Sequence, residues 1–171
     1  LPNGGNGMMI QSGANNNLVG APMPGMENVI TNNVLNGIQV DDFNTVGTVG
    51  NVISGNSITS NTLLGIDNTA GGNTEEPPPV ISGTTLGTGT VLGTSLAEDN
   101  SVIEIFTDPQ DEGKDYLGST TVSSGTWTAT GLSLPSPPFN LTATVTDTTG
   151  NTSEFSAVFV ETSVLDWHML D

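Results

Sequence analysis

The apolar residues in the first half of this chain come two or three at a time, separated by runs of Gly and Asn. The segment NGMMIQSGANNNLVG, which starts at Asn6, holds Met8-Met9-Ile10 and then Leu18-Val19. Neither patch is long enough for an amphipathic helix or for an ordinary sandwich strand. Gly and Asn tolerate the positive φ values that bend a chain sharply. The pattern therefore predicts very short strands joined by tight corners.

The same short segments recur in the same order, which indicates an internal repeat. Roughly 23 to 30 residues separate the copies. The matched pairs are Asn6-Gly7 with Ile10 and Asn36-Gly37-Ile38, NLVG at Asn17 and NTVG at Asn44, ENVITNN at Glu27 and GNVISGN at Gly50, and VLNGI at Val34 and TLLGI at Thr62. Three short strands per copy would close a triangle, and successive copies would stack with parallel, in-register pairing.

The second copy carries a recognisable pattern. NVISGN at Asn51, followed by Ile58, Asn61 and Gly65-Ile66, resembles the right-handed parallel β-helix repeats of the pectin-lyase-like superfamily. The likeness is greatest to the Asn-rich repeats of large secreted bacterial surface proteins, and it covers about residues 5–68. It implies an all-β fold that opens with a short right-handed parallel β-helix of two to three coils, over residues 1–70.

The character of the sequence changes at residues 68–80. Residues 71–79 combine Gly, two Glu and three Pro, which predicts a linker that is flexible at first and then stiff and exposed. Short strands are then expected near residues 80–86, 88–96, 101–107, 115–122, 125–131, 139–147 and 153–162.

Two of these expected strands have a clear pattern. FNLTATVTD alternates, which predicts one buried face with Leu141, Ala143 and Val145. SVIEIFTD places Ile103 and Ile105 on one side. GTWTATG and TVTDTTGNTSEFS resemble the bacterial Ig-like domains of adhesins, which implies an antiparallel β-sandwich over residues 80–162, with the Trp in its core and a hairpin at the TDTTGNTSE stretch.

Charge is scarce but one-sided. Only 11% of residues are charged, and 18 acidic residues stand against one basic residue, Lys114, for a formal net charge of −17. We therefore expect no nucleic-acid binding, because phosphates need cations, and anionic membrane surfaces are also disfavoured. No apolar run is long enough for a membrane span. A Cys-free, lysine-poor, Thr-, Asn- and Gly-rich acidic chain is typical of bacterial extracellular proteins. We expect a secreted or cell-surface piece of a longer protein.

The sequence TDPQDEGKD concentrates Asp108, Asp111, Glu112 and Asp115 around Pro and Gly. Four carboxylates so close together are candidate calcium ligands, although their spacing does not fit an EF-hand. The alternative is a polar hairpin loop with no metal. Calcium is the one cofactor that the sequence suggests.

Catalysis has a weaker case. In the first half, Asp41, Asp42 and Asp67 offer a candidate acid and base for glycoside hydrolysis, or else they are solvated turn residues. The cation that a polysaccharide lyase of this fold would use is missing there, because this half has no Arg or Lys. His168 is the one histidine, which makes a transition-metal site improbable.

Both ends of the chain carry apolar residues that a lone domain would not be expected to expose. Residues 163–171 form an apolar tail with Leu165, Trp167, Met169 and Leu170. The tail either packs on the sandwich as a last edge segment or docks elsewhere. At the other end, the first coil leaves Met8, Met9 and Ile10 at an open edge. These two sets are candidate self-association residues.

Together these features predict a non-enzymatic extracellular structural or adhesive module of a cell-surface protein, with self-association into a fibre as one form of it. The partners expected are other copies of the chain, neighbouring domains of a longer polypeptide, and surface glycans. The alternative is a β-helix protein that binds or degrades polysaccharide.

Overall fold

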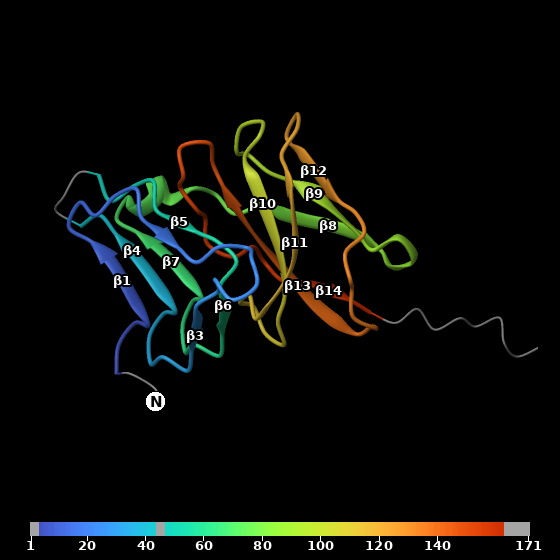
Figure 1. Ribbon diagram of the computed structural model, residues 1–171, viewed down its shortest axis with the longest axis horizontal. Coiled ribbons are helices and arrows are strands. Elements are labelled where there is room, and N and C mark those ends of the chain that lie inside the picture. The colour runs from blue at the N-terminus through green and yellow to red at the C-terminus, as the bar shows by residue number, and fades with distance from the viewer. Residues whose placement is uncertain (1–3, 44–46, 163–171) are drawn as a thin grey trace, which may run out of the picture.

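The computed structural model describes residues 4–43 and 47–162, and these residues contain β-strands and short 3-10 turns but no α-helix (Figure 1). The first half contributes strands that are two to four residues long, as the spacing of the apolar patches predicts. They are β1 (Met8–Gln11), β2 (Leu18–Val19), β3 (Val29–Thr31), β4 (Ile38–Asp41), β5 (Val52–Ile53), β6 (Ser57–Thr59) and β7 (Ile66–Thr69).

These strands pair in parallel, each with the strand that comes three places later along the chain. The pairings are β1 with β4, β4 with β7, β2 with β5, and β3 with β6. We call residues 6–35, which hold β1 to β3, the first coil, and residues 36–63, which hold β4 to β6, the second coil; β7 begins another pass. Inside, equivalent side chains stack in ladders, such as Ile30 on Ile58 and Ile38 on Ile66, and the second-coil members are almost completely buried.

The observed register corrects part of the predicted repeat. Ile38 pairs with Ile66, so the match between VLNGI and TLLGI is confirmed. Leu18 pairs with Val52, however, so NLVG is equivalent to the segment at Asn51, and its predicted match at Asn44 lies outside the described residues. Val29 pairs with Ser57, which moves the ENVITNN equivalence to residues 55–61. The shift arises because similar Asn-apolar-apolar motifs occur in two of the parallel sheets, β2-β5 and β3-β6.

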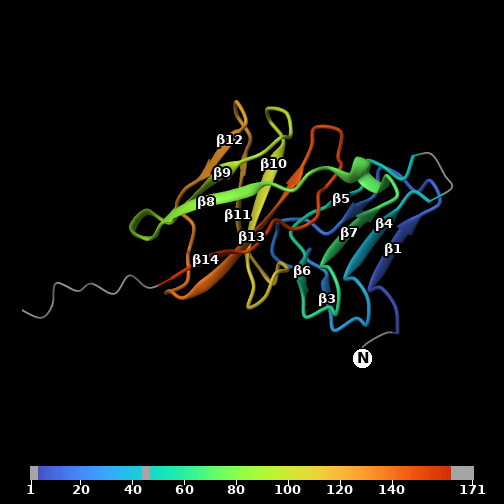
Figure 2. The same cartoon turned by 180° about the vertical axis from the view of Figure 1, so that it is seen from behind.

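The second half forms two antiparallel sheets within the described range (Figure 2). One has the order β11-β10-β13-β14 and the other β12-β9-β8. The strands are β8 (Val80–Thr85), β9 (Thr90–Thr94), β10 (Val102–Thr107), β11 (Asp115–Thr121), β12 (Thr126–Ala129), β13 (Phe139–Thr146) and β14 (Phe159–Glu161). Each overlaps a predicted strand, although β14 begins six residues later than predicted.

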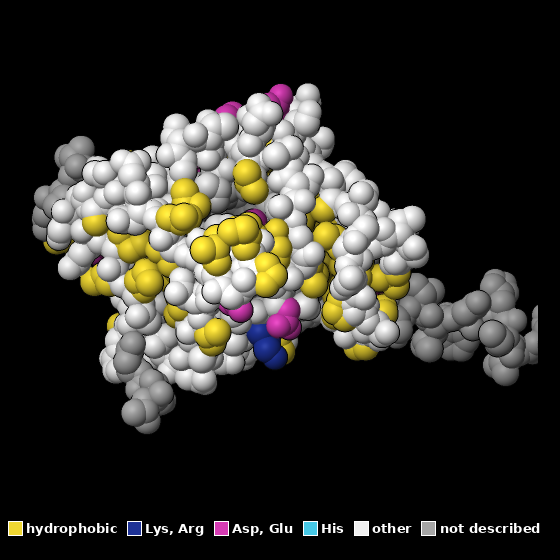
Figure 3. Space-filling model, viewed as in Figure 1, with side chains coloured by type: hydrophobic (Ala, Val, Ile, Leu, Met, Phe, Trp, Pro, Cys, Tyr) yellow, Lys and Arg dark blue, Asp and Glu magenta, His cyan; other side chains and the backbone are white. Residues whose placement is uncertain are grey.

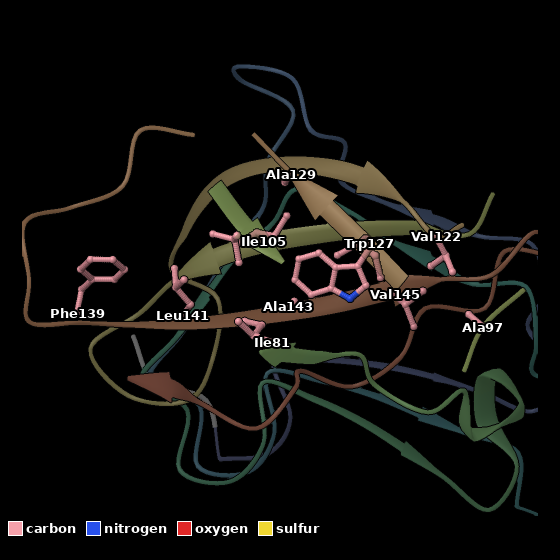
Figure 4. Packing of buried hydrophobic residues seen from close by; sticks show 12 residues of the cluster. Ile81, Ala97, Ile105, Val122, Trp127, Ala129, Phe139, Leu141, Ala143 and Val145 are labelled. Atoms are coloured by element: carbon pink, nitrogen blue, oxygen red, sulfur yellow. The ribbon is translucent and has the colours of Figure 1, made fainter. Parts of the chain in front are cut away.

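A core fills the space between these two sheets. The Trp127 indole lies among Ile105, Ala143 and Val145 (Figure 4), and its Nε1 donates a hydrogen bond to the Thr94 carbonyl at 3.1 Å. The side chain is 3% exposed. The predicted core roles of Trp127, Ile105 and the inward face of β13 are therefore confirmed.

The prediction that β13 has one buried face is wrong, because both of its faces are buried. Leu141, Ala143 and Val145 face the core, and Thr142 and Thr144, on the opposite face, are also at most 1% exposed. That opposite face packs against the coils, where Thr144 lies beside Ile53 and Ile58. The sandwich therefore sits on the end of the coil stack, as Figure 1 shows.

The predicted linker is more ordered at its start than its composition suggests. Gly72 and Asn73 are buried within a short 3-10 segment, η1 (Gly72–Glu75), and Asn73 hydrogen-bonds to the coils. A side chain at Gly72 would place its Cβ only 2.1 Å from the Val40 carbonyl oxygen. Glycine is thus required there by a close backbone approach rather than by flexibility.

Candidate functional site: the junction that closes the coil stack

Asparagine side chains join the two coils at their corners. Asn61 Oδ1 accepts hydrogen bonds from the backbone N–H and the Nδ2 of Asn33, at 3.1 and 2.8 Å. Asn51 receives the same two bonds from Asn17, and Asn56 receives them from Asn28. In each pair the asparagine of the later coil accepts from the earlier coil. We call these three pairs the asparagine ladder.

The Glu112 carboxylate occupies the acceptor position that an asparagine of a further coil would fill. Asn61, the last member on one side, donates its backbone N–H to Glu112 Oε2 at 3.0 Å and its Nδ2 to Glu112 Oε1 at 2.8 Å. Next to this contact, Ile58 and Gly113 exchange two backbone hydrogen bonds of 2.9 Å. The loop between β10 and β11 therefore continues the side-chain ladder, and it pairs with the backbone of β6 through one antiparallel bridge.

Other side chains of the second half close the neighbouring positions. Glu104, on β10, accepts from the Ser54 hydroxyl at 2.6 Å and the Gly55 N–H at 2.9 Å. Thr152 Oγ1 accepts from the Ile53 N–H at 2.9 Å, and Asn151 Oδ1 accepts from the Gly50 N–H at 2.6 Å. The bonds from the Gly50, Ile53 and Gly55 N–H groups each satisfy a backbone donor that would otherwise end the stack unpaired.

The segment between β13 and β14 also covers the last strands of the coils. Glu154 Oε1 accepts from the Asn68 N–H at 3.0 Å, and the Phe155 ring covers Gly65, where an added Cβ would meet it at 2.7 Å. Ser153 and Ser156 instead use their hydroxyls to accept from β13 N–H groups. The backbone N–H groups of the same two serines donate to β13 carbonyls, at 2.8 Å each. This mixed pairing explains why β14 starts late, because hydroxyl oxygens take the place of the carbonyl acceptors of a regular strand.

Burial raises the pKa of three of these carboxyl groups above the ordinary glutamate value. For Glu104 the hydrogen bonds from Ser54 and Gly55 offset burial only in part. For Glu112, burial acts with the nearby Asp108 and Asp111 against the bonds from Asn61. For Glu154, burial acts with Asp67 and Glu75 against the Asn68 bond. Ionisation of these three carboxyl groups therefore lowers the stability of the fold, and protonation restores it.

The free energy of unfolding is expected to fall as pH rises from about 4.5 towards neutrality. A carboxyl whose folded-state pKa is raised stabilises the fold fully below its unfolded pKa, near 4.3, and loses that contribution as pH rises through the folded value. Asp147 acts oppositely: burial raises its pKa, but bonds from Asn151 and Thr149 outweigh this and lower it, so its contribution is lost only under more acidic conditions. Urea unfolding at a series of pH values measures the profile.

Glu104→Gln is the matched variant for this profile. A glutamine amide can accept from the Gly55 N–H through its oxygen and donate to the Ser54 oxygen, so both bonds survive without the charge. The variant should be at least as stable as the parent near pH 7 and should show a shallower decline with pH. A parent whose stability rises steadily from pH 4.5 to 7 would contradict the prediction.

The predicted calcium ligands have separate roles. Asp108 and Glu112 are 3% and 1% exposed, and Asp108 accepts from the Thr59 hydroxyl and the Gln110 N–H. Asp111 and Asp115 lie in solvent. Among residues 4–43 and 47–162, no group of three or more His, Cys, Asp or Glu is placed to hold a metal ion. The four carboxylates are therefore not arranged as a metal site, and calcium binding by the chain stays an untested prediction.

The candidate catalytic acids are also hydrogen-bonded within the coils. Asp67 Oδ2 accepts from Asn36 Nδ2 and Gln39 Nε2, each at 2.8 Å. Asp42 accepts from the N–H groups of Gly47 and Thr48, and Asp41 from that of Phe43. Asp67 thus serves as an acceptor between neighbouring strands, and the other two carboxylates accept from backbone N–H groups that are close to them in sequence.

The predicted self-association residues divide between the two ends. Met8 packs on the coil core, Ile10 is buried and Met9 is 48% exposed. Leu165, Trp167, Met169 and Leu170 lie outside the described residues, as does His168. Only the first of the two predicted surfaces can therefore be assessed.

A groove of about 560 Å³ runs along the junction on the face shown in Figure 3, where hydrophobic side chains gather beside the basic one. Its walls are the loop between β2 and β3 and the start of β11. They include Pro22, Met23, Val29, Lys114, Asp115 and Tyr116. The groove combines an aromatic and apolar wall with charged groups of both signs.

Comparison with known proteins gives one match. Residues 10–91 match the family described as Protein of unknown function (DUF1565), a domain family of the parallel β-helix type. The match covers the coils and continues through η1 into β8 and β9. No curated protein matches the chain at a significant level. In the part of the chain that the structure describes, no helix is long and apolar enough to cross a membrane.

Proposed function

We propose that this chain is a non-enzymatic structural or adhesive module of an extracellular or cell-surface protein. The coils form a short right-handed parallel β-helix over residues 1–70, and residues 80–162 form an Ig-like sandwich joined to it by residues 71–79. The sandwich acts as the C-terminal cap of the helix. Solenoids need such caps, because an end coil has unpaired backbone groups and an exposed core.

One observation carries the proposal. The buried carboxylates Glu104, Glu112 and Glu154 accept hydrogen bonds from the backbone of the coils. Acid side chains on a catalytic surface would be expected to face a substrate groove. Here they hold two parts of the chain together, which supports a structural role.

Glycan binding is the second candidate, and the groove at Tyr116 favours it. Aromatic and apolar walls with a few polar groups are the usual lining of ligand sites. A chain with a net charge of −17 repels polyanions, so this candidate predicts a neutral glycan rather than an acidic one.

A polysaccharide panel separates the candidates. The structural proposal expects no release of reducing sugar from acidic or neutral polysaccharides. On a glycan array, it expects Tyr116→Ala to give the same signal as the parent. Sugar release that Asp67→Asn abolishes in a folded variant would overturn the non-enzymatic assignment. Protease shaving and surface labelling of intact source cells test the location, and a chain reached only after lysis would contradict it.

A further inference from the structure

We propose that the N-terminal end of the coil stack is a docking surface for one more parallel coil of the same asparagine repeat, stacked ahead of the first coil. This inference rests on the β-helix assignment proposed above and names the partner that this end of the helix takes. The surface consists of Asn17, Asn28 and Asn33 with the outer edges of β1, β2 and β3.

The direction of the asparagine ladder is the first argument. Asn51, Asn56 and Asn61 each use Oδ1 to accept from the coil before them. Asn17, Asn28 and Asn33 occupy the register-equivalent positions in the first coil, and their Oδ1 atoms accept no hydrogen bond from any described residue. In a preceding coil, the backbone N–H groups at the equivalent positions could donate to these three Oδ1 atoms.

Burial along the stack is the second argument. Asn33 and Asn61 are both buried, at 7% and 9% exposed, so the third ladder pair shows no change along the stack. In the other two pairs, Asn51 and Asn56 are 0% and 3% exposed, whereas their first-coil equivalents Asn17 and Asn28 lie in solvent. The inward side chains follow the same gradient, since Ile30 is 8% exposed and its partner Ile58 is 1%. A coil placed ahead of the first would give it the environment that the second coil already has.

The edge itself is the third argument. Sheet edges that stay unpaired are usually protected by charged residues, proline or bulges. β1, β2 and β3 contain none of these residues, and Glu27 is the one charged residue within the first coil. With one charged residue in the first coil, this end is close to neutral and suited to pairing.

The occupant is a coil on the N-terminal side of the same polypeptide rather than a second copy of this chain. A second copy cannot offer the donors of its own last coil, because Glu104, Glu112 and Glu154 already accept from them. Two N-terminal ends face to face would set asparagine acceptors against acceptors. The chain enters the stack at this end, where the Gly5 carbonyl accepts from the Leu35 N–H. This geometry also weighs against a head-to-tail fibre.

A tandem duplication tests the proposal. Asn6 aligns with Asn36, so a second copy of residues 6–35 inserted ahead of Asn6 adds one coil in register. The added coil should fold onto the surface. The N–H groups of its copies of Asn17, Asn28 and Asn33 should exchange with solvent about tenfold or more slower than in the unfolded chain, as expected for one net hydrogen bond each.

The matched control changes the receiving coil only. Asn17→Ala with Asn28→Ala in the original coil should return exchange in the added coil to near the unfolded rate. An added coil that exchanges freely and is trimmed by protease in both backgrounds would overturn the proposal. So would a parent that sediments as a dimer and becomes monomeric on Leu18→Asp, since a second copy would then be the occupant. If the added coil docks and the chain also cleaves sugar, the proposed non-enzymatic function is wrong, but the docking surface stands.

Discussion

Residues 4–79 expressed without the second half are expected to be unfolded, whereas residues 77–162 should fold alone with reduced stability. Truncation removes every acceptor that the sandwich offers to the coils and exposes Ile53, Ile58 and Ile66, which are at most 3% exposed in the full chain. So few stacked coils cannot bury a core by themselves. Circular dichroism and amide NMR dispersion of the two fragments measure the outcome.

The asymmetry between the fragments follows from where each core lies. The sandwich keeps its own core between its two sheets, with Val91, Trp127 and Leu141 among its members. It loses only the contacts of its outer face, where Glu104 and Phe106 become exposed. A folded coil fragment as stable as the coils of the full chain would show that the two halves are independent domains on a linker, and the cap would then be no more than a contact.

The alternation of apolar residues was enough to predict the strands of the second half, because a sheet with a filled core imposes that pattern directly. The parallel stacking of the first half was also predictable from repetition. Register was harder to predict. Asn-Leu-Val at residue 17 and Asn-Val-Ile at residue 28 differ too little to show which parallel sheet each belongs to, and only the pairing with Val52 and Ser57 decides it.

The junction could be predicted only in part. Asp108 and Glu112 attracted attention as a carboxylate group, but their partners Thr59 and Asn61 lie about 50 positions away in sequence, and no local pattern reveals such contacts. Glu104 had a usable signal. It shares a strand face with Phe106, opposite Ile103 and Ile105, and a large aromatic beside a lone acid indicates that this second face is also covered.

The serine and threonine residues near the end of the chain carried less information still. Thr152, Ser153 and Ser156 are buried and hydrogen-bonded to backbone groups, although their residue types are among those most often exposed. Their burial results from two sheets and a coil end meeting at one place. The periodicity of apolar residues predicts which face of a single strand is buried. It does not predict which strand faces contact another part of the fold.

Glu112→Ala is expected to lower the free energy of unfolding by about 3 kcal/mol at neutral pH. The variant removes two charge-assisted hydrogen bonds and leaves the Asn61 N–H buried without an acceptor, and each such loss costs about 1–3 kcal/mol. The free energy of unfolding of Glu112→Gln should lie between those of the parent and of Glu112→Ala. The glutamine oxygen can accept from one of the two Asn61 donors, but the glutamine NH2 group faces the other donor. Urea unfolding of the full chain gives all three values.

Two further variants show whether the loss comes from the ladder contact. Asp111→Ala removes the exposed neighbouring carboxylate, which opposes the Glu112 charge, and should therefore not lower the unfolding midpoint. Combining Glu112→Ala with Asn61→Ala should cost less than the sum of the single changes by about 2 kcal/mol, as is typical of residues in direct contact. Additive losses would mean that Glu112 stabilises its own loop rather than the coils. The side chain would then not be a substitute for the next asparagine, and the sandwich would cover the stack without continuing it.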